Sequence, residues 1–123
     1  MSADSSWSVA DLRAFERDLL FAVRALERQD SPPKGLAVKS YLDAEYPEEI
    51  NHSRLYQNLD KHVERGLLEK AERDGRTNEY ATTEQARTLL NTFARRRAEQ
   101  TGIELESDSA PSQTDAFEQE GES

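Results

Sequence analysis

Hydrophobic residues recur every three or four positions in the first part of the chain. Over residues 11–29 this spacing predicts an amphipathic helix, because the apolar positions share one arc at about 100° per residue. The arc consists of Leu12, Phe15, Leu19, Ala22, Val23 and Leu26. Phe21 falls on the opposite side, between Ala14 and Ala25. We assign the arc to the core and the Phe21 patch to a partner subunit, although a single exposed phenylalanine fits the pattern almost equally well.

Two shorter helices follow a proline break at "SPPKG". The second helix is predicted over residues 36–46, with Leu36, Ala37, Tyr41 and Leu42 at helical spacing, and it stops before Pro47. Asn51 is a good N-cap for a third helix that runs to residue 65, and Gly66 is suited to its C-terminal end. Two short helices with a tight connection indicate a helix-turn-helix.

The segment "LLEKAERDGRTNEYAT" alternates around an Asp-Gly turn, which predicts a two-stranded hairpin. A last helix follows, capped by Thr82 or Thr83, and Thr82 with Gln85 fits a capping box. It ends near Gly102 and carries Ala86, Leu89, Leu90 and Phe93 on one face. The fold class is therefore mainly α with a small β-hairpin wing, a winged helix-turn-helix with an additional C-terminal helix for dimerisation.

The third helix has the composition of a helix that reads DNA. Leu55, Leu59 and Val63 form its buried arc, with His62 and Tyr56 at the edges. Arg and Lys pair with guanine edges in the major groove, and Asn and Gln pair with adenine. The candidate DNA-binding residues of the recognition helix are Asn51, His52, Ser53, Arg54, Tyr56, Gln57, Asn58, Lys61 and Arg65, and those of the wing are Arg73, Arg76, Thr77 and Asn78. An ordinary solvated helix face has a similar composition, so the preceding helix and the wing decide in favour of DNA.

Acidic residues are concentrated at the C-terminal end. The chain has 25 acidic and 16 basic residues, a net charge of −9, whereas nucleic-acid binders are expected to be basic. Eight of the acidic residues and no basic residue lie between 99 and 123, so residues 1–98 are nearly neutral. We therefore expect a flexible N-terminus over 1–10, a DNA-binding and dimerisation domain over 11–101 and an acidic, disordered tail over 102–123. Acid-rich, lysine-poor composition favours a halophile over an ordinary acidic protein.

Several function classes are excluded by composition. The chain has no cysteine, so disulfides, thiolate metal sites and thiol redox sensing are absent. Its two histidines, His52 and His62, project some 15 Å apart along one helix, too far to share a metal ion. No catalytic constellation and no cofactor motif is visible, and no apolar run is long enough for a membrane span. We expect a cytoplasmic protein that is not an enzyme.

The segments "RLYQNLDKHVERGLLEK" and "RTNEYATTEQA" resemble the PadR-like family of winged helix-turn-helix transcription regulators. The shared positions are Leu55, Tyr56, Leu59, Gly66, Leu67, Arg76, Tyr80 and Thr83, and "GLAVKSYL" looks like the second helix of the family. The acidic tail and the excess of Arg over Lys look like haloarchaeal members, and the whole chain resembles haloarchaeal regulators of the reactive-oxygen response. Gln57 departs from the family, which often has proline there.

The resemblance implies a homodimer that binds double-stranded DNA. Members dimerise through the first and last helices, which implies contacts through Phe21, Leu89, Leu90 and Phe93. Two recognition helices would then meet half-sites about one turn apart in a pseudo-palindrome. The resemblance also allows an unidentified small-molecule effector in a pocket near Trp7. The alternative function is a winged helix that binds another protein, which the nearly neutral body charge would suit.

Overall fold

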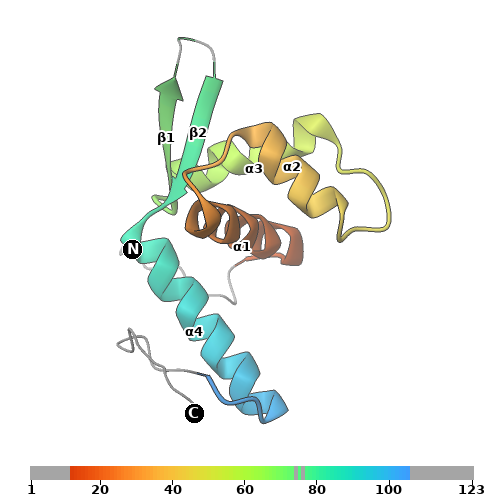
Figure 1. Cartoon of the computed structure of the whole chain (residues 1–123), viewed down its shortest axis with the longest axis vertical. Coiled ribbons are helices and arrows are strands. Elements are labelled where there is room, and N and C mark those ends of the chain that lie inside the picture. Colours follow the sequence, from red (N-terminus) through yellow and green to blue (C-terminus); the bar gives the residue numbers. More distant parts are fainter. Residues whose placement is uncertain (1–11, 74, 76, 106–123) are drawn as a thin grey trace. The chain divides into compact units, whose positions relative to one another are not determined.

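The computed structural model describes residues 12–73, 75 and 77–105. Its elements are α1 (Ala14–Gln29), α2 (Gly35–Asp43), α3 (His52–Glu64), β1 (Leu68–Arg73), β2 (Thr77–Thr82) and α4 (Glu84–Thr101) (Figure 1). The chain divides into two compact units, residues 1–93 and 94–123, with the boundary inside α4. Trp7, Arg76, the predicted flexible N-terminus over 1–10 and residues 106–123 of the predicted disordered tail over 102–123 lie outside the described residues.

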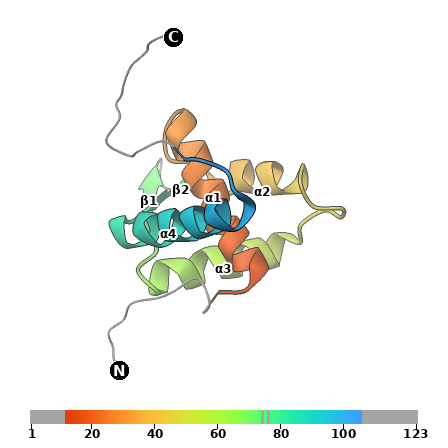
Figure 2. The same ribbon diagram turned by 90° about the horizontal axis from the view of Figure 1, so that it is seen from below.

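Helix α1 begins three residues later than predicted. The backbone N–H of Arg13 donates a hydrogen bond of 2.9 Å to the carboxylate of Glu16, which fixes the first turn. The predicted arc then forms the centre of the core, since Phe15, Leu19, Ala22 and Val23 are all buried. Helix α1 packs against α2, α3 and β2 (Figures 1 and 2).

The buried face of α2 differs from the prediction. Val38 and Leu42 are buried, whereas Leu36 is 60% exposed. The helix starts at Gly35, where it touches the next helix: a Cβ there would lie 2.4 Å from the phenol oxygen of Tyr56. The side of α2 that contains Gly35, Val38 and Leu42 therefore faces the rest of the chain, which residue spacing within α2 alone did not reveal.

The predicted ends of α3 are confirmed. The Asn51 side chain accepts a hydrogen bond of 2.9 Å from the backbone N–H of Arg54. At the other end Gly66 has a φ of 79°, a left-handed conformation that glycine adopts without strain. The buried arc is centred differently, because His62 is fully buried while Val63 is only partly buried.

The predicted hairpin is also confirmed. β1 and β2 pair antiparallel from Leu68 opposite Thr82 to Arg73 opposite Thr77. The free edge of β2 meets the segment before α2. The Tyr80 N–H donates to the Pro33 carbonyl at 2.9 Å, and the backbones of Lys34 and Glu79 form an isolated antiparallel β-bridge. The wing is therefore joined by backbone hydrogen bonds to the start of the helix-turn-helix.

Helix α4 is capped by Thr83, whose hydroxyl accepts from the backbone N–H of Ala86 at 3.2 Å. The predicted capping box at Thr82 is wrong, because that side chain donates a hydrogen bond to the carboxylate of Glu27 on α1. Glu27 also accepts from the Thr82 backbone at 3.0 Å and from Arg24 at 2.9 Å. Burial alone would raise the pKa of Glu27, but these hydrogen bonds outweigh it and the pKa is lowered.

The end of α4 is confirmed near Gly102, which has a φ of 81°. The following residue closes the helix, since the N–H of Ile103 donates to the carbonyl of Ala98 at 3.0 Å. No helix in the described part of the chain is long and apolar enough to cross a membrane.

Candidate nucleic-acid interface

One row of α3 is fully available for contact. Ser53, Gln57 and Lys61 are spaced four residues apart, so they follow one side of the helix, and all three are exposed. Within residues 12–73, 75 and 77–105, none of their three side chains makes a hydrogen bond or an ion pair. The row combines a hydroxyl, an amide and an ammonium group, which together offer donors and acceptors to base edges and phosphates.

The first turn of α3 adds three more predicted residues. Asn51 caps the helix, and the ring of His52 contacts that of Tyr56 at a tilt of 45°, with centroids 4.7 Å apart. Arg54 is exposed, and its guanidinium carbon lies 4.0 Å from the ring centroid of Phe15 on α1. The structure therefore gathers Asn51, His52 and Arg54 at the start of the exposed row.

The other predicted residues of α3 are drawn into contacts within the chain. Tyr56 is partly buried and packs on Gly35. The Asn58 amide donates to the backbone carbonyl of Arg54 at 2.8 Å. Arg65 turns inward, and its guanidinium lies 3.4 Å from the carboxylate of Glu16. A helical wheel placed Arg65 on the DNA-facing side, but the side chain is long enough to reach back over the last turn to α1.

His62 is confirmed as a packing histidine and is more deeply buried than expected. Its Nε2 lies 2.9 Å from the backbone oxygen of Glu16, which only accepts, so this nitrogen carries the proton. Its Nδ1 faces the guanidinium of Arg65 at 3.4 Å. Burial lowers the pKa of His62 to about 4, with the nearby Arg65 charge acting in the same direction and the hydrogen bond to Glu16 acting against it. The imidazole is therefore neutral at pH 7.

Glu16 completes this cluster beneath α3. Burial would raise the pKa of Glu16, but the Arg13 N–H and the Arg65 guanidinium lower it. The carboxylate is therefore ionised and holds Arg65 on the core side of the helix. No group of three metal-ligating side chains occurs among the residues that the structure describes.

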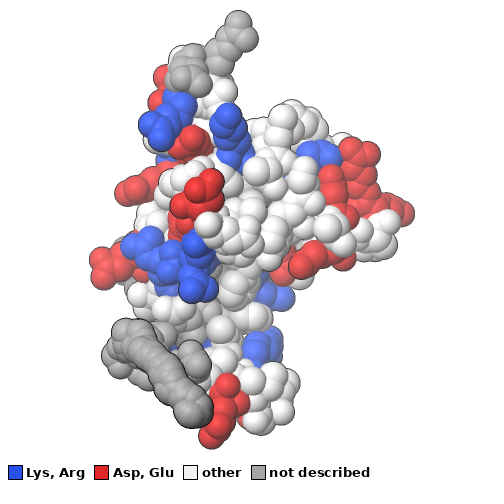
Figure 3. Space-filling view, viewed as in Figure 1, with Lys and Arg blue, Asp and Glu red and all other residues white. Residues whose placement is uncertain are grey.

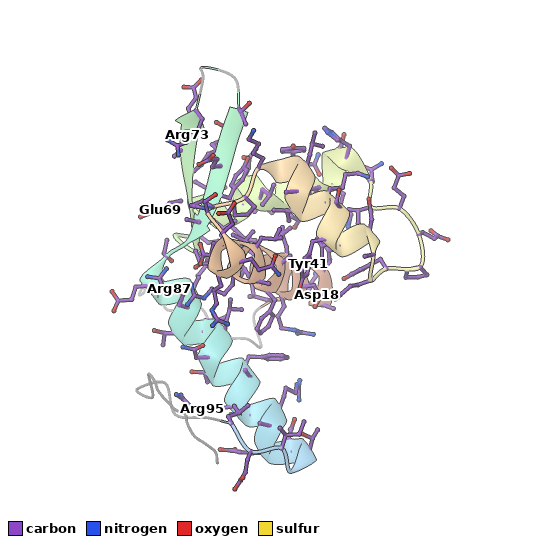
Figure 4. All side chains as sticks on the ribbon, in the orientation of Figure 1. Asp18, Tyr41, Glu69, Arg73, Arg87 and Arg95 are labelled. Atoms are coloured by element: carbon purple, nitrogen blue, oxygen red, sulfur yellow. The ribbon has the colours of Figure 1, made fainter. Side chains whose placement is uncertain are left out.

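The wing meets α3 through a pair that the sequence did not suggest. The ammonium of Lys70 on β1 lies 3.4 Å from the carboxylate of Asp60 on α3. Nearer the tip, Arg73 is paired with Glu79 at 3.1 Å and its side chain remains 63% exposed (Figure 4). Thr77 and Asn78 are half-buried, and the fourth predicted wing residue, Arg76, is outside the described ranges.

Acidic side chains gather over the loop between α2 and α3 (Figure 3). Glu45, Glu48 and Glu49 are exposed there, directly before the N-cap of α3. Lys39 offsets part of this charge, because its ammonium lies 2.8 Å from Glu49 and 3.0 Å from Asp43. The candidate interface thus has basic and amide groups on α3 beside a negatively charged loop, without the excess of positive charge that drives non-specific DNA binding.

Two solved structures of RosR from H. salinarum match this chain over most of its length. One, from crystals grown in NaBr, is 37% identical and covers 77% of this chain and 82% of that chain, with a TM-score of 0.67. The other, a complex named hsRosR-S4, is 35% identical, and the match covers 83% of this chain and 84% of that chain with a TM-score of 0.70. The chain belongs to the RosR family of winged helix-turn-helix transcription regulators. This confirms the predicted fold class and the resemblance to haloarchaeal regulators of the reactive-oxygen response.

More distant structures share the winged-helix fold of the RosR family. A MarR-family regulator from Rhodococcus is 21% identical, covers 80% of this chain and 66% of that chain, and has a TM-score of 0.58. No protein-family model matches the sequence, and neither does any curated protein. Assignment to the PadR-like subtype therefore remains a prediction.

Two of the four predicted dimer residues are buried within the single chain. Leu89 and Leu90 are 6% and 2% exposed, so they leave little surface for a partner. Phe21 and Phe93 are partly buried and contact each other, with ring centroids 5.6 Å apart. The second small patch predicted on α1 is thus partly covered by Phe93 on α4 of the same chain. The predicted contacts between two copies of this chain remain a prediction.

Proposed function

We propose that the protein is a homodimer that binds pseudo-palindromic sites in double-stranded DNA and regulates genes of the oxidative-stress response in a halophile. It acts in the cytoplasm by binding rather than by catalysis. Membership of the RosR family supports regulation through DNA, and the composition of the chain supports the halophile. The observation that carries sequence-specific binding is the exposed row of Ser53, Gln57 and Lys61. Their side chains make no hydrogen bond or ion pair with any described residue.

Gln57 is the residue of this row best suited to read a base. A glutamine amide forms two hydrogen bonds to the edge of adenine, and a good pair of this kind contributes about 1–3 kcal/mol of discrimination. Lys61 and Arg73 are suited to phosphates, because a single charge positions the protein without reading sequence. Lys70 on the wing pairs with Asp60 on α3 at 3.4 Å, so the two candidate DNA-binding elements are neighbours.

The test is a selection of duplexes from a random pool, followed by gel-shift titration in molar KCl. We expect Gln57→Ala to lower the preference for the selected duplex over a duplex changed at one adenine. Arg73→Ala is expected to weaken both duplexes equally. Gln29→Ala is the matched control, because Gln29 is exposed at the last residue of α1, outside α3 and the wing.

Absence of any sequence preference in the wild-type protein would refute this function and favour the alternative, a winged helix that binds another protein. Equal losses for Gln57→Ala and Arg73→Ala on both duplexes would instead refute the separate roles of these two residues.

The homodimer is tested by sedimentation in the same salt. Two recognition helices placed about one turn of DNA apart require half-sites with a centre-to-centre spacing of about 34–36 Å. We expect a dimer that binds one duplex carrying two half-sites, and weaker binding when the spacing is changed by five base pairs. A monomer that binds a single half-site with full affinity would contradict the proposal. Mapping of bound genomic sites with and without an oxidant tests the role in oxidative stress.

A further inference from the structure

The guanidinium of Arg54 lies over an aromatic pair formed by α1 and the loop between α2 and α3. Its central carbon lies 4.0 Å from the ring centroid of Phe15 on α1. Tyr46, in the loop between α2 and α3, meets the same ring edge-on, with centroids 5.9 Å apart and planes at 89°. A planar guanidinium stacks well on an aromatic face. Arg54 is therefore placed by α1 and by the loop as well as by its own helix.

The aromatic pair is itself fixed. The phenol of Tyr46 donates a hydrogen bond of 2.6 Å to the carboxylate of Asp18, which follows Phe15 on α1 by one turn. Figure 4 labels Asp18 on this helix. Phe15 is 5% exposed, so its ring has little freedom to move. Burial and the Asp18 carboxylate raise the pKa of Tyr46 to about 12, so the phenol remains a donor. The surface on which Arg54 rests is thus held by a hydrogen bond, a ring contact and burial.

The position of Arg54 in its helix disfavours a purely stabilising role. It is the third residue of α3, where the partial positive charge of the helix N-terminus repels a cation. A guanidinium carries five N–H donors, and none of those of Arg54 bonds to a residue in the described part of the chain. The side chain is oriented by stacking while its donors remain available at the exposed face.

We propose that Phe15 and Tyr46 are positioning residues that hold Arg54 ready to make a two-pronged hydrogen bond to a guanine edge in the major groove. The proposal rests on the proposed function and names the residues that prepare one of its contacts. An arginine that is immobilised before binding does not lose its side-chain freedom on binding. The cost avoided corresponds to a factor of about three to ten in affinity.

The test compares Phe15→Leu, Arg54→Ala and the double variant in the full chain. Affinity is measured in molar KCl for the selected duplex and for one in which the contacted guanine is replaced. We expect Phe15→Leu to weaken binding to the selected duplex about threefold to tenfold and to leave the replaced duplex nearly unchanged. In the Arg54→Ala background, Phe15→Leu should cause no further loss.

Val23→Ala controls for lost core packing, because Val23 is fully buried on α1 about 12 Å along the helix from Phe15. Val23→Ala is expected to lower the stability of the fold but to leave unchanged the ratio of the affinities for the selected and the replaced duplex. Tyr46→Leu is the second variant if Phe15→Leu does not fold, since Tyr46 is only partly buried. We expect it to lower the same ratio.

A readout without DNA follows the side chain directly. NMR relaxation of the Arg54 Nε–H group should show a rigid guanidinium in the wild-type protein and a mobile one in Phe15→Leu. The positioning role would be overturned if the losses of DNA affinity from Phe15→Leu and Arg54→Ala added up in the double variant. A mobile Arg54 guanidinium in the wild-type protein would also overturn it. A wild-type protein without sequence preference would refute the proposed function, whereas a normal preference that Phe15→Leu leaves intact would refute only this inference.

Discussion

Protonation of His62 is expected to destabilise the fold in mildly acidic solution. The imidazole is fully buried, its Nε2–H donates to the Glu16 carbonyl and its Nδ1 faces the Arg65 guanidinium, so the native structure accommodates only the neutral form. Its pKa is about 4 in the folded protein, against an ordinary value of 6.5 that the unfolded chain keeps. Below pH 6.5 the unfolded chain therefore binds the additional proton, and stability falls with pH until both states are protonated near pH 4.

The magnitude follows from the difference between these two pKa values. A difference of one pKa unit between the folded and unfolded states corresponds to about 1.36 kcal/mol. The free energy of unfolding is therefore expected to fall by about 2 kcal/mol between pH 8 and pH 5. The lowered pKa of Glu16 acts in a separate range, because its contribution is present above pH 4.5 and is lost as the pH falls below that value. The window from pH 6.5 to 5 therefore isolates the histidine.

The assay is urea unfolding followed by circular dichroism at pH 8, 6.5 and 5, at constant protein and KCl concentrations. His62→Gln is the comparison, because it keeps a donor of similar reach but does not titrate. The variant is expected to be less stable at pH 8 and to lose the dependence on pH between 6.5 and 5. An equal dependence in the variant and the wild-type protein would refute the assignment to His62. Exposed His52 serves as the site for a control, His52→Gln, which should keep the wild-type dependence.

Three further predictions concern contacts between elements. Glu27→Gln should lower the free energy of unfolding by about 1.5–3 kcal/mol in thermal melts, because it weakens charged hydrogen bonds to β2; an unchanged midpoint would contradict this. Gly35→Ala should cost about 1–3 kcal/mol, since its Cβ would overlap the phenol of Tyr56, and Tyr56→Leu in the same chain should recover part of the loss. Lys70→Glu, opposite Asp60, should weaken binding to all duplexes alike while changing stability by less than about 1 kcal/mol; a change in base preference would show that the wing reads sequence.

The sequence predicted features that depend on neighbours along the chain. The N-cap at Asn51, the glycine end at Gly66 and the Asp-Gly hairpin are all local, because each is set by hydrogen bonds or backbone angles within a few residues. The core arc of α1 was equally accessible, since one helix face must be buried.

Features that depend on how elements dock were not predictable in the same way. Leu36 and Val38 are both apolar, and only the contact between Gly35 and Tyr56 decides which of them is buried. Thr82 resembles a helix cap in sequence, but a carboxylate that lies 55 residues earlier takes its hydroxyl. Arg65 falls on the exposed side of a helical wheel, yet the ionised Glu16 beneath the helix draws it inward.

The backbone bridge at Pro33 and Lys34 limits where the chain tolerates changes in length. These two residues pair with β2, so an added residue between them and α2 would shift either the strand register or the first turn of the helix. The loop before Asn51 has exposed residues at 44, 45 and 47–49 and carries no such pairing with the wing among the described residues. Insertions are therefore expected to be accepted by the fold at residues 47–49, beyond the Tyr46 contacts, and rejected at the bridge, which makes the bridge a fixed reference point for redesign of this fold.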